Sequence, residues 1–491
     1  MSATHQVLLA GGGLGYQIPY SLRFRAANSA NLSRTFGSPT DGKKFTLSWW
    51  MKRGTLTAVV SILSAISGTS NFSLQFSTQT GNGSGDFLRV ANPNTAATYL
   101  YTDTAIFRDP SAWYHFVFVF DSANATAGDR AILYVNGTRL SATVSVTLNA
   151  TTRWNENSAT GNIGFGRSGF VDARDYYDGH MAEFHSIDGQ ALTPSSFGQT
   201  TGSVWVPKKY SGTYGTNGFY LKFADATTTT TIGNDSSGNA NNWTTSGISV
   251  TSGVTFDQMT DTPTTNFCVL NPLIPSAANI SWANLRSGTT AVRGTINALL
   301  ANSYWEVTAG GSAVTAGTIS DAAATNTTTV TANKVFGFRL TSAGTLDYIN
   351  ITDAGSWTNI TSGLSGQQFP YGITAAADWS FGQRAFVGTV PSGYAAVSTA
   401  APISAAVTLS GSFTGNAAAD GPVIWTNGNP ATLTINGNGV TFGTHADKTA
   451  GGFKLRTSSA SYNASGTNNW TATAGNRFVQ SKRPNNGQVN P

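Results

Sequence analysis

The sequence predicts an all-β protein, and three observations support this fold class. Only 10% of the 491 residues are charged, against about 25% in an ordinary globular domain. Glutamate occurs at three positions only, whereas Gly (54 residues), Ser, Thr and Asn are abundant, and this composition favours strands and tight turns over helices. Aromatic residues make up 11% of the chain, so it has enough apolar surface to bury a core rather than remain disordered.

The first strand-rich block contains the clearest strand of the chain, WYHFVFVF. Successive strands of this block are predicted at 21–24, 45–53, 72–78, 113–120 and 131–140. In WYHFVFVF, Tyr and Phe on one face alternate with Trp, His and Val on the other, so the strand is predicted to be covered on both sides, as in a two-layer sandwich. We therefore interpret His115 as a structural residue. The next strand closes on Asn136-Gly137, a pair typical of a type I′ turn.

The chain is predicted to contain five segments. They are a glycine-hinged N-terminal arm, a first sandwich, an extended linker rich in Gly, Ser, Thr and Asn, a second sandwich and a small C-terminal β-module, at 1–20, 21–200, 201–265, 266–400 and 401–491. The linker is expected to hold one short strand, at 218–223. Runs such as SYWEVTAG and KVFGFRLTS indicate the strands of the second sandwich.

Charge and cysteine content exclude several classes of partner. The net charge of +5 is spread thinly, and no basic run resembles a nucleic-acid-binding stripe or a membrane-surface helix. Cys268 is the only cysteine, so neither an intrachain disulfide nor a cysteine zinc site can form. The N-terminus lacks the features of a secretory signal, and no segment has the apolar length of a membrane helix. We expect a chain made and folded in a cytoplasm, with no nucleic-acid partner and no membrane insertion.

Two motifs resemble ligand sites but fit packing better. GFGRSG at 164–169 matches G-x-G-x-x-G, yet another strand follows instead of a helix, so its glycines are predicted to serve strand crossings rather than a dinucleotide. His180 and His185 lie five residues apart on a predicted strand. That spacing places them on opposite faces, so we expect no shared zinc ion.

The carboxylates do not suggest a hydrolase. Glycosidases need two carboxylates that face each other across the scissile bond, but Glu156, Glu183 and Glu306 are isolated along the chain. Most Asp residues fall in predicted turns. We therefore predict no catalytic residues and no enzyme activity.

The cluster DARDYYD at 172–178 is the one candidate ligand site. Carboxylates suit Ca²⁺, and exposed tyrosine rings suit the apolar face of a sugar. The weak candidates for Ca²⁺ ligands are Asp172, Asp175 and Asp178, and the candidate ligand-binding aromatics are Tyr176 and Tyr177. The alternative interpretation is a solvated loop whose tyrosines pack back on the sheet. We predict no other metal or cofactor.

The first block resembles laminin-G-like, concanavalin A-like jelly-roll domains. The resemblance rests on FTLSWWMKR, AWYHFVFVFD with AILYVNGTRL, GNIGFGRSG and DGHMAEFHSIDGQALTPSSFG. It implies the concanavalin A-like fold for this block. Members of this family often bind Ca²⁺ at rim loops, which supports the candidate cluster, although the second, distant ligand loop of the usual pattern has no match here.

The chain as a whole resembles large structural proteins of tailed bacteriophages. SLRFRAANSANLSRTFGS and WVPKKYSGTYGTNGFYLKF carry this resemblance in and beyond the first block, and SYWEVTAG with WSFGQRAFVGTVPSGYAAVSTA matches the SPRY-like domain that follows in such proteins. The tail resembles the small β-module that comes next. The implied architecture is two concanavalin A-like sandwiches in series plus a small β-module.

The resemblance implies a virion protein, and the fold suggests its role. We expect a tail fibre, spike or tail-associated adhesin that contacts host-surface polysaccharide and other virion proteins, as a homo-oligomer with a trimer favoured. The alternative is a head decoration or other purely structural virion protein without a ligand. A third hypothesis, a tail glycan depolymerase, is disfavoured by the missing carboxylate pair.

Overall fold

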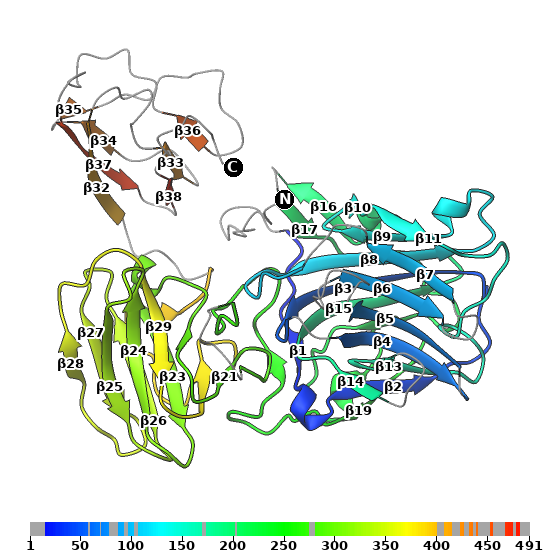
Figure 1. Cartoon of the computed structure of the whole chain (residues 1–491), viewed down its shortest axis with the longest axis horizontal. Helices are drawn as coiled ribbons and strands as arrows, with labels where there is room; N and C mark the ends of the chain where they lie inside the picture. Colours follow the sequence, from blue (N-terminus) through cyan, green and yellow to red (C-terminus); the bar gives the residue numbers. More distant parts are fainter. Residues whose placement is uncertain are drawn as a thin grey trace. The chain divides into compact units, whose positions relative to one another are not determined.

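The computed structural model contains β-strands and short 3-10 turns as its regular elements, with no α-helix among the residues that it describes (Figure 1). The structure describes residues 15–56, 59–68, 70–77, 87–92, 97–102, 107–168, 173–201, 204–273 and 280–399, and the strands between 407 and 481. None of the described helical turns could cross a membrane. The predicted all-β class is confirmed.

The first sandwich consists of two antiparallel sheets of eight strands each. Sheet A has the order β10 (Thr138–Arg139), β9 (Ala131–Val135), β8 (Tyr114–Asp121), β3 (Lys44–Arg53), β15 (Gly179–Asp188), β1 (Ser21–Phe24) and β20 (Gln258–Met259), with β18 (Phe219–Leu221) also paired to β15. Sheet B has the order β11 (Ala142–Val144), β7 (Ala97–Thr102), β6 (Phe87–Asn92), β5 (Ser70–Ser77), β4 (Val60–Ser67), β12 (Thr160–Ile163), β2 (Asn31–Thr35) and β19 (Thr244–Ser246). Two hairpins flank these sheets, β13 (Phe165–Ser168) with β14 (Ala173–Tyr176) and β16 (Gly198–Thr201) with β17 (Val204–Pro207).

Strand β8 is buried on both faces, as its sequence predicts. Phe116, Phe118 and Phe120 point into the core between the two sheets, where Phe45 of the neighbouring β3 stacks on Phe120. The opposite face carries Val117 and Val119, which pack in a second apolar cluster with Ile187 and Phe197. Because segments of the chain cover the outer face of sheet A, that face needs apolar residues too.

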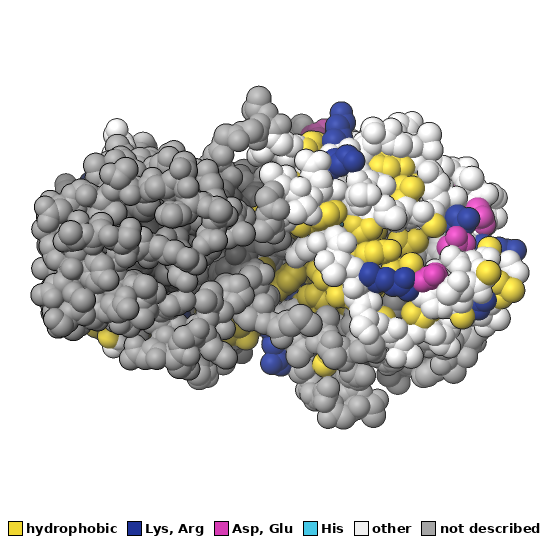
Figure 2. Space-filling model, turned by 90° about the horizontal axis from the view of Figure 1, so that it is seen from above, with side chains coloured by type: hydrophobic (Ala, Val, Ile, Leu, Met, Phe, Trp, Pro, Cys, Tyr) yellow, Lys and Arg dark blue, Asp and Glu magenta, His cyan; other side chains and the backbone are white. Residues whose placement is uncertain are grey.

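The edge of the sandwich at β9, β10 and β11 holds a shallow pocket. Its lining residues are Ala131, Ile132, Leu133, Arg139, Leu140, Ser141, Ala142 and Val144. Figure 2 looks down on the side of the molecule where these strands lie in Figure 1 and shows hydrophobic side chains among polar and charged ones. The turn between β9 and β10 is the predicted one, with positive φ at both Asn136 (46°) and Gly137 (80°). A side chain at Gly137 would lie 2.5 Å from the Trp205 ring, so glycine is required there.

The prediction that residues 201–265 form an extended linker is wrong. Instead of only connecting two domains, this segment adds β18 to β15, β19 to β2 and β20 to β1, and thus extends both sheets of the first sandwich. Trp243 and Phe219 are buried in its core. Short strands between Asn- and Asp-rich turns resemble a linker in composition, and the long-range pairing that orders them leaves no local pattern.

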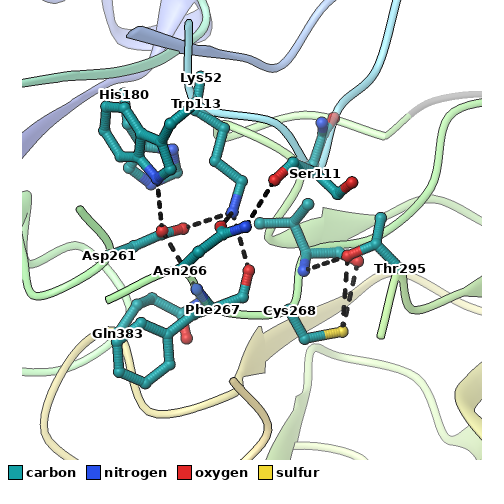
Figure 3. A network of polar contacts seen from close by, with 12 residues as sticks. Lys52, Ser111, Trp113, His180, Asp261, Asn266, Phe267, Cys268, Thr295 and Gln383 are labelled. Carbon is teal, nitrogen blue, oxygen red and sulfur yellow. Dashed lines mark hydrogen bonds and ion pairs between the residues drawn. The ribbon is translucent and has the colours of Figure 1, made fainter. Parts of the chain in front are cut away.

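The segment after β20 is held against sheet A by a buried ion pair (Figure 3). Lys52 of β3 donates its three N–H bonds to Asp261 Oδ2 (2.8 Å), Asn266 Oδ1 (2.7 Å) and the Phe267 carbonyl oxygen (2.8 Å). The other oxygen of Asp261 accepts hydrogen bonds from Trp113 Nε1 (2.9 Å) and the Phe267 amide (3.2 Å). The side chains of the ion pair are 1% and 0% exposed, so this polar network is both dry and fully bonded.

The second sandwich has its own core around Trp305, Trp379 and Phe338. Sheet C has the order β21 (Arg286–Ser287), β30 (Ala377–Ser380), β23 (Ser303–Ala309), β26 (Val335–Leu340), β27 (Leu346–Asn350) and β28 (Thr358–Thr361), with β31 (Ala395–Ala396) also paired to β23. Sheet D has the order β22 (Val292–Arg293), β29 (Gln368–Ile373), β24 (Val314–Ser320) and β25 (Thr325–Val330). SYWEVTAG thus forms a central strand, β23, of this second sandwich.

The C-terminal segment is a separate small unit of strands. One sheet has the order β32 (Val407–Thr414), β37 (Thr467–Ala474), β34 (Thr432–Ile435) and β35 (Asn438–Gly439), and the other has the order β36 (Gly452–Lys454), β33 (Val423–Thr426) and β38 (Phe478–Ser481). Two sandwiches followed by a smaller β-module were the predicted architecture.

Candidate functional site

The predicted ligand cluster at 172–178 is divided between the surface and the interior. Tyr176, at the end of β14, is half-buried, and its ring lies 5.0 Å from that of Phe165 on β13. Asp175 is also half-buried. Tyr177 and Asp178, in contrast, are buried. Asp172 lies outside the described residues. Only part of the predicted cluster is therefore placed at a surface.

Tyr177 and Asp178 bond to the backbone of other segments rather than facing a ligand, which corrects the prediction of Tyr177 as a ligand-binding aromatic and of Asp178 as a candidate Ca²⁺ ligand. The Tyr177 hydroxyl donates to the Lys52 carbonyl oxygen (2.8 Å), and its ring is 1% exposed. Asp178 accepts hydrogen bonds from the amides of Ala283 (3.0 Å) and Ala26 (3.4 Å). Burial raises the pKa of the Asp178 carboxyl to about 6. Within the described part of the chain, no three His, Cys, Asp or Glu residues are grouped so that they could hold a metal ion.

The outer face of sheet B is polar, although its inner face is apolar. On β5, Phe72, Leu74 and Phe76 belong to the core, so the residues that alternate with them point outward. These are Asn71, Ser73 and Gln75. Cross-strand register extends this pattern over the sheet in two rows, Ser33–Asn162–Ser64–Ser73 and Ser61–Gln75–Arg89. We call these seven side chains, together with Asn71, the polar face. All of them except Arg89 are neutral hydroxyls or amides.

The hairpin β13–β14 lies directly against the polar face. Ser64 Oγ donates to the Phe165 carbonyl oxygen (2.9 Å), and a side chain at Gly166 would lie 2.5 Å from Ser61. This close approach explains the second glycine of GFGRSG, which serves packing and not phosphate binding. Because Gly166 faces sheet B, its neighbour Phe165 and the paired Tyr176 face away from the sheet. The hairpin therefore covers part of the polar face and presents two half-buried rings on its far side.

Access to the polar face differs along its length. Asn71, Ser73 and Gln75 are 5%, 2% and 2% exposed, whereas Ser33 and Arg89 are half-buried. The hydroxyl of Ser61 is buried and has no hydrogen-bond partner among the described residues. A buried hydroxyl without a partner has lost its hydrogen bonds to water and has not replaced them, which costs free energy of folding. The polar face thus contains hydrogen-bonding capacity that the described fold does not use.

His115 is a buried structural residue, as predicted. Its ring stacks on Trp50 at 4.7 Å and lies 6.0 Å from the Trp205 ring. Trp205 Nε1 donates to Nδ1 (2.9 Å), and because an indole N–H can only donate, the proton of the neutral imidazole must be on Nε2. Nε2 then donates to Ser48 Oγ (2.9 Å). Burial lowers the pKa of His115 to about 3.

His180 and His185 lie on one face of β15, which corrects the predicted opposite placement. The register of β15 against β3 shifts between Ala182 and His185, and Glu183 has a φ of 50°. This β-bulge adds one residue and reverses the alternation beyond it. The two histidines pair with Lys52 and Ser48 of β3, four residues apart along that strand. That separation is about 13 Å along the strand, so the opposite-face placement from which no shared zinc ion was expected is wrong.

The bulge also forms a buried network that the sequence did not reveal. Glu183 accepts hydrogen bonds from the hydroxyls of Tyr16 (2.9 Å) and Tyr220. His185 stacks on Tyr220 at 4.1 Å, and its Nε2 lies 3.6 Å from Glu183 Oε2. Burial and the neighbouring Glu183 raise the pKa of Tyr220. Residues 15–20, the described end of the predicted arm, pack on sheet A through Ile18, whose amide donates to Thr264 Oγ1 in the segment after β20.

The three glutamates lie at three separate places. Glu183 belongs to the outer face of sheet A, Glu156 pairs with Arg153, and Glu306 lies on β23 of the second sandwich. The carboxylate of Glu306 accepts hydrogen bonds from the amides of Val387 and Gly388. Each glutamate therefore has a structural partner, and no two of them share a strand.

Comparisons with known proteins identify the fold of the first sandwich. Residues 26–197 match the profile of the laminin G family described as the concanavalin A-like lectin/glucanases superfamily. The first sandwich has this concanavalin A-like fold, as predicted. No curated protein matches the chain.

The chain also matches solved structures, with low sequence identity and low TM-scores. The heptameric SAP-like pentraxin of Limulus polyphemus is 16% identical, with 36% of this chain and 80% of the pentraxin covered and a TM-score of 0.28. Domains LG4-5 of the mouse laminin alpha1 chain are 9% identical, with 79% and 97% covered and a TM-score of 0.27. The CBM40 of the Ruminococcus gnavus IT-sialidase, bound to alpha2,3 sialyllactose, is 14% identical, with 37% and 92% covered and a TM-score of 0.24.

Proposed function

We propose that this protein binds host-surface polysaccharide through the first sandwich and has no enzyme activity of its own. The observation that carries the proposal is that the outer side of sheet B carries both a polar face of neutral hydroxyls and amides and, on the hairpin that covers part of it, the outward ring pair of Phe165 and Tyr176. A sugar offers many hydroxyls and a few apolar C–H faces. A site that combines neutral hydrogen-bonding groups with an aromatic ring matches both features.

The binding role fits the description of the matched family, which names lectins as well as glucanases. We carry over the lectin part, because hydrolysis needs a carboxylate pair and the three glutamates lie apart. We propose further that the chain is a virion protein of a tailed bacteriophage, in a tail fibre, spike or other adhesin. As a homotrimer it would present three copies of the site, and linked weak sites give strong overall attachment.

Tyr176→Ala is expected to weaken glycan binding about tenfold, because it removes the outward ring. Ser33→Ala should weaken binding as well, since it removes a half-buried hydroxyl from the polar face. A glycan array would identify the ligand, and titration calorimetry would measure the affinity of each variant. Tyr371→Ala, which removes a half-buried tyrosine of β29 in the second sandwich, is the matched control and should bind as the wild type does. Equal affinity of Tyr176→Ala, Ser33→Ala and the wild type would contradict the proposed site.

The place of the protein on the particle needs a separate experiment. Purified chain is mixed with host cells before phage is added, and phage adsorption is then counted. Dose-dependent blocking would support an adhesin. If the chain does not bind cells but binds stripped particles, the head-decoration alternative is favoured, and shortening of the polysaccharide during incubation would favour a depolymerase.

A further inference from the structure

The outer face of sheet C carries a charged and aromatic row that crosses four strands. Tyr304 of β23 pairs with Arg339 of β26, which pairs with Asp347 of β27, which in turn pairs with Asn359 of β28. Cross-strand partners on one face lie about 5 Å apart and interact directly. The row is therefore a continuous strip of side chains.

Arg339 lies between two aromatic rings near the middle of this strip. The carbon of its guanidinium is 4.2 Å from the centre of the Trp357 ring and 5.6 Å from that of Tyr394. Both rings are half-buried, and the Arg339 side chain is 26% exposed. The face of an aromatic ring attracts a guanidinium and so holds it in one orientation. The arginine thus has a defined position but remains open to solvent.

Only one side of this guanidinium is bonded within the described chain. Nε donates to Asp347 Oδ2 (2.8 Å), and Asp347 is fixed in turn by Asn359 Nδ2 (2.9 Å). The terminal nitrogens of Arg339 have no hydrogen-bond partner among the described residues. Arg23 of the first sandwich is a useful contrast, because it bonds Asp257 through Nε and two backbone carbonyl oxygens through Nη2 while it is 1% exposed. Arg23 is structural, whereas the terminal donors of Arg339 are used by no described residue and its side chain is partly open to solvent.

Hydrogen bonds and a ring contact connect the strip to a neighbouring loop. Tyr304 donates to Glu306 Oε1 (2.9 Å), and Glu306 holds the amides of Val387 and Gly388. The ring of Phe386 packs edge-on against Tyr304 at 4.8 Å. The loop that borders the strip is therefore tied to β23, so little ordering remains to be done when a ligand binds.

We propose that this strip, which we call the Arg339 site, binds an acidic sugar residue of a polysaccharide. The two terminal nitrogens of Arg339 would hold the carboxylate, since a guanidinium fork matches a carboxylate in shape and charge. The Trp357 ring would lie against the apolar face of the sugar. The amide nitrogen of Asn359 is used by Asp347, but its amide oxygen remains a neutral acceptor for a sugar hydroxyl, which favours a sugar over an acidic peptide. This site lies on a different sandwich from the polar face and does not depend on it.

Titration of the full chain with sodium glucuronate and a short oligoglucuronate tests the proposal, with methyl glucoside as the neutral comparison. We expect the oligoglucuronate to bind and methyl glucoside not to compete. Arg339→Lys keeps the charge but loses the fork, so its affinity should fall about tenfold or more, and Trp357→Ala should also bind more weakly. Arg139→Gln, which removes an exposed arginine of the first sandwich, should leave the affinity unchanged. Unfolding temperatures check that each variant is folded.

The failure of this site and that of the polar face can be distinguished. The titration is repeated in Tyr176→Ala, where glucuronate binding should persist whatever happens to neutral glycans. Undiminished binding in Arg339→Lys would overturn the Arg339 site. Equal binding of a short glutamate peptide, lost in the same variants, would overturn the assignment to a sugar and leave a general carboxylate site.

Discussion

Asp261→Ala is expected to destabilise the folded chain by about 3–5 kcal/mol. The substitution removes the carboxylate from Lys52, whose ammonium group is 1% exposed, and an uncompensated buried charge is costly. It also leaves the Trp113 indole N–H without its acceptor. Urea unfolding, followed by far-UV circular dichroism, measures the change. Because this pair fixes the segment after β20 to sheet A, the substitution should destabilise both the first sandwich and the segment that leads to the second sandwich.

Two comparisons isolate the buried charge. Lys52→Met combined with Asp261→Ala should be more stable than Asp261→Ala alone, because no buried charge then lacks a partner. Asp129→Asn breaks an ion pair with Arg139 in which both side chains are well exposed (35% and 49%) and should cost less than about 1 kcal/mol. If Asp261→Ala costs no more than Asp129→Asn, the network in Figure 3 does not stabilise the fold.

The sequence predicts those parts of the fold that local alternation determines. WYHFVFVF identifies β8 as a strand covered on both sides, and Asn136-Gly137 identifies its hairpin turn, because both signals lie within a few residues. The short strands of 201–265 carry no such signal. They exist because β15, β2 and β1 offer edges to pair with, and these partners are distant in the sequence.

Side-chain direction is predictable only until a bulge intervenes. Even–odd counting along β15 fails beyond Glu183, because the extra residue reverses the alternation. For the same reason the network of Glu183, Tyr16 and Tyr220 has no sequence signature. Lys52 is a related case. A lysine near the end of a strand is ordinarily predicted to be exposed to solvent, and nothing near it in the sequence indicates that Asp261, from a distant segment, pairs with it in the interior.

The candidate site is predictable in part. Tyr176 was identified because tyrosines near a turn suit a sugar, and it is half-buried at the surface of the β13–β14 hairpin. Its neighbour Tyr177 points inward because successive strand residues alternate in direction. The Arg339 site could not be predicted, because its four row residues come from four strands and only the register brings them together.

Acidification is expected to destabilise the protein through its buried histidines. His115 has a pKa of about 3 in the folded chain and about 6.5 when unfolded. Between these values the unfolded state binds more protons, so the stability contributed by neutral His115 is present above pH 6.5 and is lost as the pH falls. The loss amounts to about 1.4 kcal/mol per pH unit for one group. Burial also lowers the pKa of His180, which acts in the same direction.

Asp178 has the opposite effect on the pH dependence of stability, so variants of Asp178 and His115 can be compared as a test. Its pKa of about 6 lies above its ordinary value of 3.8, so the folded state binds the proton more readily and Asp178 disfavours folding as the pH rises from 4 to 6. In urea unfolding at pH 7.5 and 5, His115→Gln should be less stable than the wild type at pH 7.5 but should lose less stability on acidification. Asp178→Asn should lose more than the wild type. Equal pH slopes for the wild type and His115→Gln would show that His115 takes up protons equally in the folded and unfolded states, which would contradict the buried neutral imidazole that accepts a hydrogen bond from Trp205 Nε1.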